Sequence, residues 1–497
     1  MTSSGTNQDG HAASAAWELL LPAASAPARA RGRSLQAALR EAVRSGRLAP
    51  GTRLPSSRDL AVDLGVSRGL VTEAYEQLTA EGYLRSGRGA GTWVGRAVRA
   101  APARARDLAP RSPGAGADFL PGTPDLALFP RSAWAAALRG VLAELPHQDL
   151  GYPDPRGLPR LRTALAELLA RRRGVVADPE RIVVVSGVAQ ATTLLGFVLH
   201  ARGMRAIGVE DPGSPQHDAL YASAGVGVVP LPLDDEGLVV GPLKASGVRA
   251  VVTTPAHQYP TGIAYSAQRR AELLDWARSV DGFVLEDDYD GDFRYDRAPV
   301  GALQGLDPER VLYAGSVSKS LAPALRLGWL LVPDSLADEV VERKRTMDLG
   351  HPTLDQAAFA RFLEGGDYDR RLRRCQRAYR ERRDALVAAL EEHLPGSSVS
   401  GIAAGLHVIA TLPKRYGPQE RFLARMAAAG VAIRTLTDCT HTPAGHGGSD
   451  GSKRSRDSYG SKESDGDKDV RLVLGYAHLP PARIRAGIRL MAEAATV

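Results

Sequence analysis

The segment from Gly315 to Leu330, GSVSKSLAPALRLGWL, places two cations among largely apolar residues. Lys319 is flanked by Ser316 and Ser318, and Arg326 follows seven residues later. A lone lysine is usually a solvated surface charge, but a desolvated amine beside a second cation is more readily a neutral nucleophile. A chemical role for Lys319 therefore depends on which other groups share its site.

Three further motifs carry groups that could bind the same ligand. VLEDDYDGDF (284–293) ends an apolar strand with carboxylates and a tyrosine, at the strand end where open α/β sheets bind ligands. VVVSGVAQATTLL (183–195) is typical of a strand, a Ser-Gly turn and a helix start, which offers free backbone N–H groups to a phosphate. HQYPTG (257–262) is a turn that follows another strand.

One kind of ligand would use all of these groups together. Lys319 would react with an aldehyde. The serine hydroxyls, Arg326 and the helix start would bind a phosphate, and a carboxylate would pair with a protonated ring nitrogen. Pyridoxal 5′-phosphate has these parts, and it characteristically uses a lysine imine and an aspartate partner for its pyridinium. The motifs therefore indicate a pyridoxal phosphate site.

The elements around these motifs predict an α/β fold. Apolar, β-rich runs at 181–187, 248–255, 282–288 and 310–316 alternate with longer helical patterns such as Leu158–Arg172. This alternation favours a mostly parallel sheet with helices on both faces. We see no internal repeat, and no metal site is predicted.

Length and composition limit the class of protein to which the chain can belong. The chain has 497 residues, 44% of them hydrophobic and 24% charged, which predicts at least two domains. It has no apolar run long enough for a membrane span, and the first thirty residues lack a signal-peptide pattern. Only two cysteines occur, which excludes a disulfide framework and fits a reducing cytoplasm.

The basic residues are concentrated near the N-terminus. The net charge is +7, and between Arg31 and Arg99 twelve arginines face six acidic residues, an excess of six. A solvated basic surface is one interpretation, and a nucleic-acid footprint, driven by counterion release, is the other. The apolar spacing over 34–45 predicts a first helix in this block.

Two more helices and a hairpin follow. Ser56 is placed to cap a second helix, with Asp59 completing a capping box, and Gly65 ends that helix. Ser67 then caps a third helix, so the two helices form a helix-turn-helix. Residues 83–94, YLRSGRGAGTWV, predict a small hairpin with a basic tip, which would form a wing.

The string RLPSSRDLAVDLGVSRGLVTEAYEQLTAEGYLRSGRGAGTWV (53–94) resembles the winged helix-turn-helix of the GntR family of bacterial regulators. The resemblance implies that the third helix enters the major groove of double-stranded DNA and the wing approaches the minor groove. Arg68 is the strongest candidate for specificity, because a guanidinium can bind guanine O6 and N7 together. The implied DNA-binding residues are Arg58, Ser67, Arg68, Thr72 and Gly89.

The region from Asp118 onward resembles fold-type I aminotransferases, and with the winged helix in front of it the chain is similar to the MocR-type subfamily of GntR regulators. The resemblance implies that Lys319 forms the internal aldimine, Asp287 pairs with the pyridine nitrogen and Tyr289 hydrogen-bonds the ring hydroxyl. The implied phosphate ligands are Ser316, Ser318, Arg326 and the backbone at Gly187 and Val188.

The resemblance also implies two contacts away from the cofactor-binding motifs. Tyr152 in GYPDPRGLPRLR would reach the phosphate of a neighbouring subunit, because such domains generally form homodimers across their sites. Arg471 in VRLVLGYAHLP would grip the carboxylate of an effector, and an ordinary surface arginine is the alternative.

Three positions depart from the aminotransferase pattern. Ser214 stands where the family usually has a ring that stacks on the cofactor, Tyr259 replaces the usual asparagine, and Ala189 replaces a more polar residue. These departures argue against full catalytic turnover, although a half-reaction remains compatible with them.

Composition also divides the chain. Residues 1–30 form a tail, 31–97 the winged helix, 98–117 a linker rich in Ala, Pro, Arg and Gly, and 118–497 the aminotransferase-like domain with a smaller C-terminal α+β subdomain. Within the last, 441–469 is polar and of low complexity and is predicted to be a disordered insertion.

The favoured interpretation is a cytoplasmic, dimeric transcriptional regulator without a membrane partner. Its large domain would sense pyridoxal phosphate, or an amine or amino-acid adduct of it. The alternatives are a working aminotransferase with an accessory DNA-binding module, and a regulator whose large domain has lost the cofactor.

Overall fold

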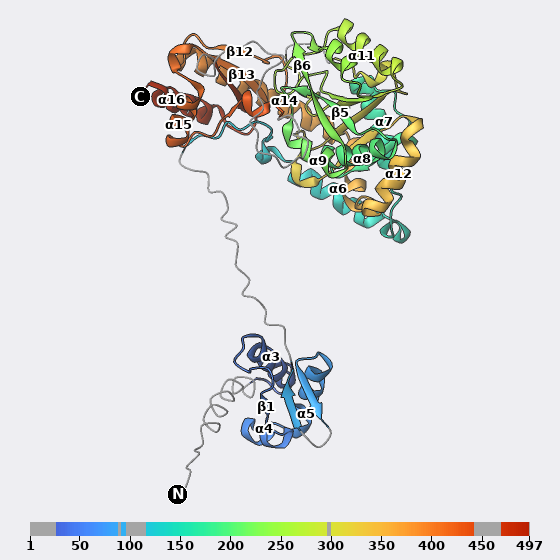
Figure 1. Ribbon diagram of the computed structural model, residues 1–497, viewed down its shortest axis with the longest axis vertical. Helices are drawn as coiled ribbons and strands as arrows, with labels where there is room; N and C mark the ends of the chain where they lie inside the picture. The colour runs from blue at the N-terminus through green and yellow to red at the C-terminus, as the bar shows by residue number, and fades with distance from the viewer. Residues whose placement is uncertain (1–25, 88–90, 96–115, 296–299, 442–468, 497) are drawn as a thin grey trace, which may run out of the picture. The chain divides into compact units, whose positions relative to one another are not determined.

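The computed structural model describes residues 26–87, 91–95, 116–295, 300–441 and 469–496. The chain divides into two compact units, Met1–Ser112 and Pro113–Val497 (Figure 1). Within the described part of the chain, no helix combines the length and the apolar character needed to cross a membrane.

The described residues of the first unit form a core of three helices with a small antiparallel sheet. Leucines from all three helices, with Val71, form one buried cluster, so the helical spacing read from the sequence produces a core. Strand β3 pairs with both β2 and β1, and β2 and β3 form the predicted hairpin. The elements are α3 (Arg31–Arg44), β1 (Arg53–Leu54), α4 (Ser57–Leu64), α5 (Arg68–Ala80), β2 (Leu84–Gly87) and β3 (Gly91–Val94).

The predicted caps set the geometry of the helix-turn-helix. Ser56 Oγ accepts a hydrogen bond from the Asp59 amide (3.2 Å) and donates its own hydrogen to the Asp59 carboxylate (2.7 Å). Gly65 ends α4 at φ +62°, a conformation that glycine adopts without strain. Ser67 then caps α5 by accepting from the Leu70 amide (3.3 Å). The two helices are therefore joined by the tight turn that the sequence predicts.

An eight-stranded sheet organises the second unit. Its order is β4-β11-β10-β9-β8-β5-β6-β7, and the pairs from β10 through β6 are parallel, whereas β11 runs antiparallel to both of its neighbours. The sheet is thus mostly parallel, as predicted. The strands are β4 (Ile182–Val185), β5 (Ala206–Asp211), β6 (Gly227–Asp234), β7 (Gly237–Leu238), β8 (Ala250–Thr253), β9 (Phe283–Asp287), β10 (Val311–Ser316) and β11 (Gly328–Leu331).

Helices cover both faces of this sheet, which explains its continuously apolar strands. In β4, Ile182 and Val184 join the buried cluster that includes α7 and α13, whereas Val183 and Val185 join the cluster that includes α8 and α12. The helices of this part are α6 (Arg131–Glu144), α7 (Pro159–Arg173), α8 (Val188–Ala201), α9 (Asp218–Ser223), α10 (Val240–Ala245), α11 (Ala267–Ser279), α12 (Asp334–Asp348) and α13 (Thr353–Glu364).

The C-terminal part forms the predicted smaller α+β subdomain. Its antiparallel sheet has the order β12-β13-β15-β14, and alternate β15 residues Val470, Leu472 and Leu474 pack in the same cluster as α14 and α16. The elements are α14 (Asp367–His393), β12 (Ser398–Ser400), β13 (His407–Leu412), α15 (Gln419–Ala428), β14 (Arg434–Thr435), β15 (Val470–Gly475) and α16 (Pro481–Thr496).

Two predicted segment limits differ from the structure by a few residues. Ala117, assigned to the linker, is buried, and its carbonyl accepts from the Ala432 amide (2.8 Å). His441, assigned to the insertion, is buried, and its Nδ1 lies 2.9 Å from the Asp218 carboxylate. Composition did not reveal either contact because each partner is distant in the sequence. Residues 442–468 and 96–115 lie outside the described residues.

Candidate cofactor site and nucleic-acid interface

Lys319 lies on the loop that follows β10, at the carboxyl end of the parallel strands. Its side chain is half-buried, and Nζ donates to the Gly122 carbonyl at 2.5 Å. Burial lowers the pKa of this amine, against the opposing effect of the Asp287 and Asp290 carboxylates. A lowered pKa increases the fraction of neutral amine, which is the form that attacks a carbonyl.

Asp287 ends β9, the strand next to β10, and one of its carboxylate oxygens lacks a hydrogen-bond partner. Its Oδ1 atom is buried and has no hydrogen-bond partner in the described structure. Burial, followed by the neighbouring Asp288 charge, raises the pKa of this carboxyl to about 7. A buried carboxylate without a partner is costly, and a cationic N–H donor would satisfy both its charge and its free oxygen. The protonated ring nitrogen of pyridoxal phosphate is such a donor.

A cradle for an anion adjoins these two residues. Gly187, at φ +81°, precedes α8, whose first two N–H groups, at Val188 and Ala189, have no partner within the helix. The Arg326 guanidinium lies 3.1 Å from the place where a β-carbon on Gly187 would sit, and Arg326 donates to the Ser186 carbonyl. A side chain at position 187 would therefore strain the backbone and crowd this cation. The helix start and the guanidinium together suit a phosphate group.

One cavity of about 370 Å³ brings the predicted cofactor residues together. Its volume falls in the range of about 300–1,000 Å³ that is usual for small-molecule sites. Ser214, Tyr259 and Ala189, the three departures from the family pattern, also line it. The predicted site residues among its lining are Val188, Asp287, Tyr289, Ser316, Ser318, Lys319 and Arg326.

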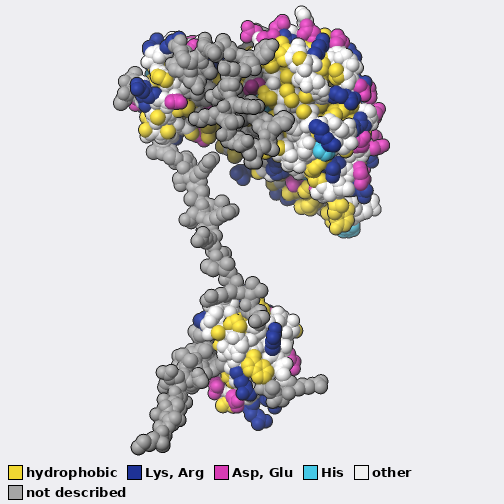
Figure 2. Space-filling view, viewed as in Figure 1, with side chains coloured by type: hydrophobic (Ala, Val, Ile, Leu, Met, Phe, Trp, Pro, Cys, Tyr) yellow, Lys and Arg dark blue, Asp and Glu magenta, His cyan; other side chains and the backbone are white. Residues whose placement is uncertain are grey.

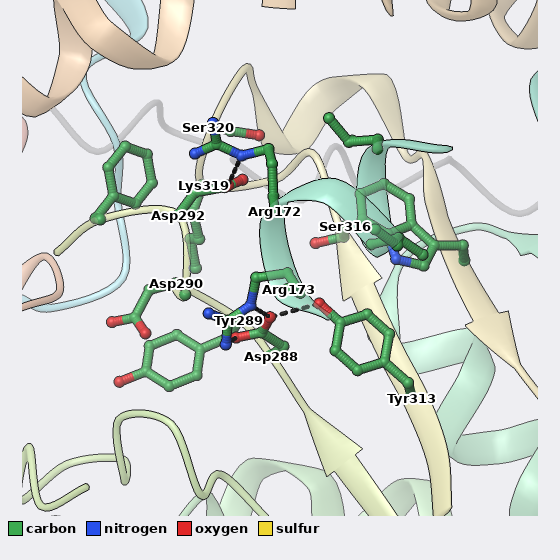
Figure 3. A pocket seen from close by; sticks show the side chains of 15 residues that line it. Arg172, Arg173, Asp288, Tyr289, Asp290, Asp292, Tyr313, Ser316, Lys319 and Ser320 are labelled. Atoms are coloured by element: carbon green, nitrogen blue, oxygen red, sulfur yellow. Dashed lines mark hydrogen bonds and ion pairs between the residues drawn. The ribbon is translucent and has the colours of Figure 1, made fainter. Parts of the chain in front are cut away.

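A buried ion pair supports the loop that carries Asp287 and Tyr289. Figure 3 shows that the Asp288 carboxylate lies between the side chains of Arg173 and Tyr313 and contacts both. Arg173 Nε donates to Asp288 Oδ2 at 2.6 Å, and the Tyr313 hydroxyl donates to the same carboxylate. Because Asp288 lies between the two site residues, this pair fixes the backbone from which both side chains project.

The structure corrects the prediction for Arg471, which lies outside the cavity. Arg471 is exposed on β15, whereas Arg434 on the neighbouring β14 lines the cavity. Arg434 pairs with Val473, two residues further along β15 from Arg471, and its Nη1 donates to the Tyr259 hydroxyl at 3.4 Å. One feature of the sequence could have identified Arg434: it directly follows a short apolar stretch and begins a strand.

The structure also places Tyr152 outside the cavity and two histidines inside it. Tyr152 is 89% exposed and is not among the residues that line the cavity, so its contact with a second subunit stays a prediction. His217 and His407 also line the cavity and were not singled out from the sequence. Burial lowers the pKa of both imidazoles, that of His407 to about 4.

The predicted DNA-binding side chains lie on the surface of the first unit. Arg58 in the first turn of α4 and Arg68 at the start of α5 are exposed, as is the capping residue Ser67, and Thr72 is half-buried one turn further along α5. Figure 2 shows basic side chains on this surface, all of them arginine because this unit contains no lysine. Gly89 lies outside the described residues. An exposed helix start with an arginine suits contact with a nucleic acid groove.

A helix-turn-helix with a wing, followed by an aminotransferase fold with a cofactor-type cavity, defines a DNA-binding regulator with a ligand-binding domain. Residues 32–94 match the family model of bacterial regulatory proteins of the gntR family, and residues 122–445 match that of aminotransferase class I and II.

The chain is similar to two regulators over most of its length and to one solved aminotransferase structure over its larger domain. The chain is 35% identical to the HTH-type pyridoxine biosynthesis transcriptional regulator PdxR of Corynebacterium glutamicum, over 80% of this chain and 86% of that protein. It is 35% identical to the probable rhizopine catabolism regulatory protein MocR of Rhizobium meliloti, over 93% of each. The multiple substrate aminotransferase of Thermococcus profundus matches with a TM-score of 0.64 and 27% identity, over 76% of this chain and 91% of that chain.

The chain therefore belongs to the MocR-type subfamily of GntR transcriptional regulators. The comparisons favour the regulator over the accessory-module enzyme, because relatives that share both domains are named as regulators.

Proposed function

We propose that this regulator binds pyridoxal phosphate at Lys319 and senses either that cofactor or an amine or amino acid that reacts with it, as a homodimer in the cytoplasm. The observation that carries the proposal is the buried, unpartnered Oδ1 of Asp287 in the same cavity as Lys319. When bound, the cofactor supplies an electrophilic carbonyl that exchanges between amines.

Different residues of the chain bind different parts of this ligand. Asp287 binds the ring nitrogen, Tyr289 donates to the ring oxygen, and Lys319 presents a neutral amine. The phosphate is bound by Ser316, Ser318, Arg326 and the backbone at Gly187 and Val188. Tyr152 of a second subunit completes the phosphate site.

The cavity is lined by two parts of the second unit, so a bound ligand could couple the two. Lys319 and Asp287 come from the large sheet, whereas Leu406, His407 and Arg434 come from the C-terminal subdomain, and all five line one cavity. An amino acid that reacts near Lys319 and places its carboxylate on Arg434 would contact both parts. Such a ligand favours the arrangement in which both contacts form, and this difference in affinity couples the site to DNA binding.

The test is a titration of DNA binding. Full-length protein and DNA from upstream of its own gene, measured by fluorescence anisotropy, should show a Kd that changes at least about fivefold on adding pyridoxal phosphate, alone or with candidate amines. Protein with Lys319→Ala should bind the DNA but lose this response. A Kd that is the same under all conditions would refute the sensing proposal.

Arg434→Gln should weaken amino-acid sensing selectively. A lost bidentate contact with a carboxylate should raise the amino-acid concentration for the half-maximal change in cofactor absorbance by about tenfold or more. Amines without a carboxylate should titrate as in wild type. The matched control is Arg471→Gln, which should change neither titration, and a loss confined to Arg471→Gln would restore the assignment made from the sequence motif.

The enzyme alternative rests on the similarity to a multiple substrate aminotransferase. Sustained product from amino acid and keto acid, beyond one equivalent per site, would support it. We expect at most a single half-reaction, because Ser214 leaves one face of the ring without the usual stacking side chain.

A further inference from the structure

A buried hydrogen-bonded pair, Asp290 and His257, lies next to Tyr289. His257 Nδ1 is 2.8 Å from Asp290 Oδ2 and 3.0 Å from the Tyr289 hydroxyl. The side chains of His257 and Asp290 are only 4% and 2% exposed. In Figure 3 the Asp290 carboxylate and the Tyr289 hydroxyl project toward the same side. None of the roles described above uses this pair.

The contacts indicate where the imidazole hydrogen lies. A carboxylate only accepts hydrogen bonds, so Nδ1 carries the hydrogen and donates it to Asp290. The other ring nitrogen, Nε2, is buried and has no hydrogen-bond partner in the described structure. With Nδ1 occupied by its own hydrogen, it cannot accept from Tyr289. The phenol hydrogen is therefore available to an oxygen acceptor, which is the Asp290 carboxylate in the absence of a ligand and the ligand's oxygen when one is bound.

The packing around the pair leaves little freedom. A β-carbon on Gly405 would come within 2.3 Å of His257 Cε1 and 2.7 Å of Asp290 Oδ2, so the pair fits only against a glycine. Gly405 has φ +83°, and its amide donates to the Phe293 carbonyl at 2.7 Å. The C-terminal subdomain thus closes one side of the pair.

Titratable groups from several elements interact with the pair or with Tyr289: Tyr259, Asp287, Tyr295, Lys319, His407 and Tyr476. The His407 ring lies 5.7 Å from the His257 ring and 5.3 Å from the Tyr259 ring, and burial is the largest cause that lowers its pKa, to about 4. Burial and the Asp290 charge raise the pKa of Tyr289 well above its ordinary value. Near neutral pH, His407 is uncharged and Tyr289 is protonated.

We propose that Asp290 and His257 are positioning residues that hold the Tyr289 hydroxyl as a hydrogen-bond donor to the ring oxygen of the bound cofactor. The inference rests on the proposed function. Because a donor stabilises negative charge on that oxygen, it lowers the proton affinity of the neighbouring nitrogen that joins the cofactor to Lys319. Removing the Asp290 carboxylate frees Nδ1 to accept from Tyr289, and removing His257 takes away the contact that orients the Tyr289 hydroxyl; in both cases the donor is lost.

The experiment is a pH titration of the visible absorbance of full-length protein loaded with pyridoxal phosphate alone. Asp290→Asn should raise the midpoint by about one unit, a tenfold change that corresponds to one hydrogen bond to a charged group. Tyr289→Phe should shift the midpoint in the same direction. The double variant should match Tyr289→Phe alone, since the pair acts through Tyr289.

Two further variants separate positioning from folding. His257→Asn places an amide nitrogen near the position of Nδ1 and should keep the wild-type midpoint, whereas His257→Leu should shift it. Asp292→Asn is the matched control, because this carboxylate is on the same loop but accepts from Arg172 and Tyr368. It should leave the midpoint unchanged.

An unshifted midpoint in both Asp290→Asn and His257→Leu would overturn the inference. So would a shift from Asp290→Asn that persists in the Tyr289→Phe background. Wild-type protein with no chromophore on Lys319 would overturn the proposed function and this inference with it.

Discussion

Replacing Lys319 with alanine should abolish covalent attachment of pyridoxal phosphate. Lys319 lines the cavity together with Asp287, and burial lowers the pKa of its amine, so it is suited to act as the nucleophile. After incubation with cofactor and reduction with borohydride, peptide mass spectrometry should find the added mass on the wild-type peptide and none on the variant. The attachment rate should rise with pH, since only the neutral amine reacts, and this rise should come at lower pH than for an ordinary lysine.

Two controls define this result. Lys319→Arg keeps a cation but forms no imine, so it should also show no added mass. Lys244→Ala removes an exposed lysine on α10 and should leave attachment intact. Wild-type protein that gains no mass, or that gains it on another lysine, would contradict the role of Lys319.

Replacing Arg68 with alanine should weaken binding to the specific DNA site about ten- to a hundredfold, since a guanidinium that contacts a guanine contributes about 1–3 kcal/mol of discrimination. Arg68 is exposed at the first position of α5, so the change should leave the thermal unfolding midpoint nearly unaltered. Binding isotherms on the specific site and on random DNA of equal length would measure the effect.

The comparison of the two DNAs identifies the kind of contact. If Arg68 reads a base, the specific site weakens and random DNA barely changes; if it binds a phosphate, both weaken and the salt slope falls by about one. Arg40→Ala is the control, because Arg40 pairs with Glu81 at 2.8 Å within the unit. Unchanged specific binding by Arg68→Ala would remove this residue from the interface.

The caps and strand runs were predictable because they depend on local sequence. Ser56, Gly65 and Ser67 act through contacts within three residues or through their own backbone angles, so their types alone located both helices of the helix-turn-helix. The same holds for the apolar runs that became β8, β9 and β10. Strand β11 was not foreseen as antiparallel, because strand direction depends on the path of the connecting loop.

The side chains that distant segments bring to the cavity could not be read in this way. Arg471 matches a family motif, but the register of β14 against β15 places Arg434 at the cavity instead. His257 meets Asp290 only because Gly405, more than a hundred residues away, leaves room for both.

The sequence by itself determined the class of this protein, the order of its domains, and the lysine, aspartate and arginine expected to hold a cofactor. These features follow from motifs whose residues are close neighbours in the chain. Only the tertiary structure decided which arginine lines the cavity, which carboxylate oxygen lacks a partner, and which imidazole contacts Tyr289. Those outcomes depend on strand register and on how the C-terminal subdomain packs against the large sheet, and both are set by contacts between residues far apart in sequence.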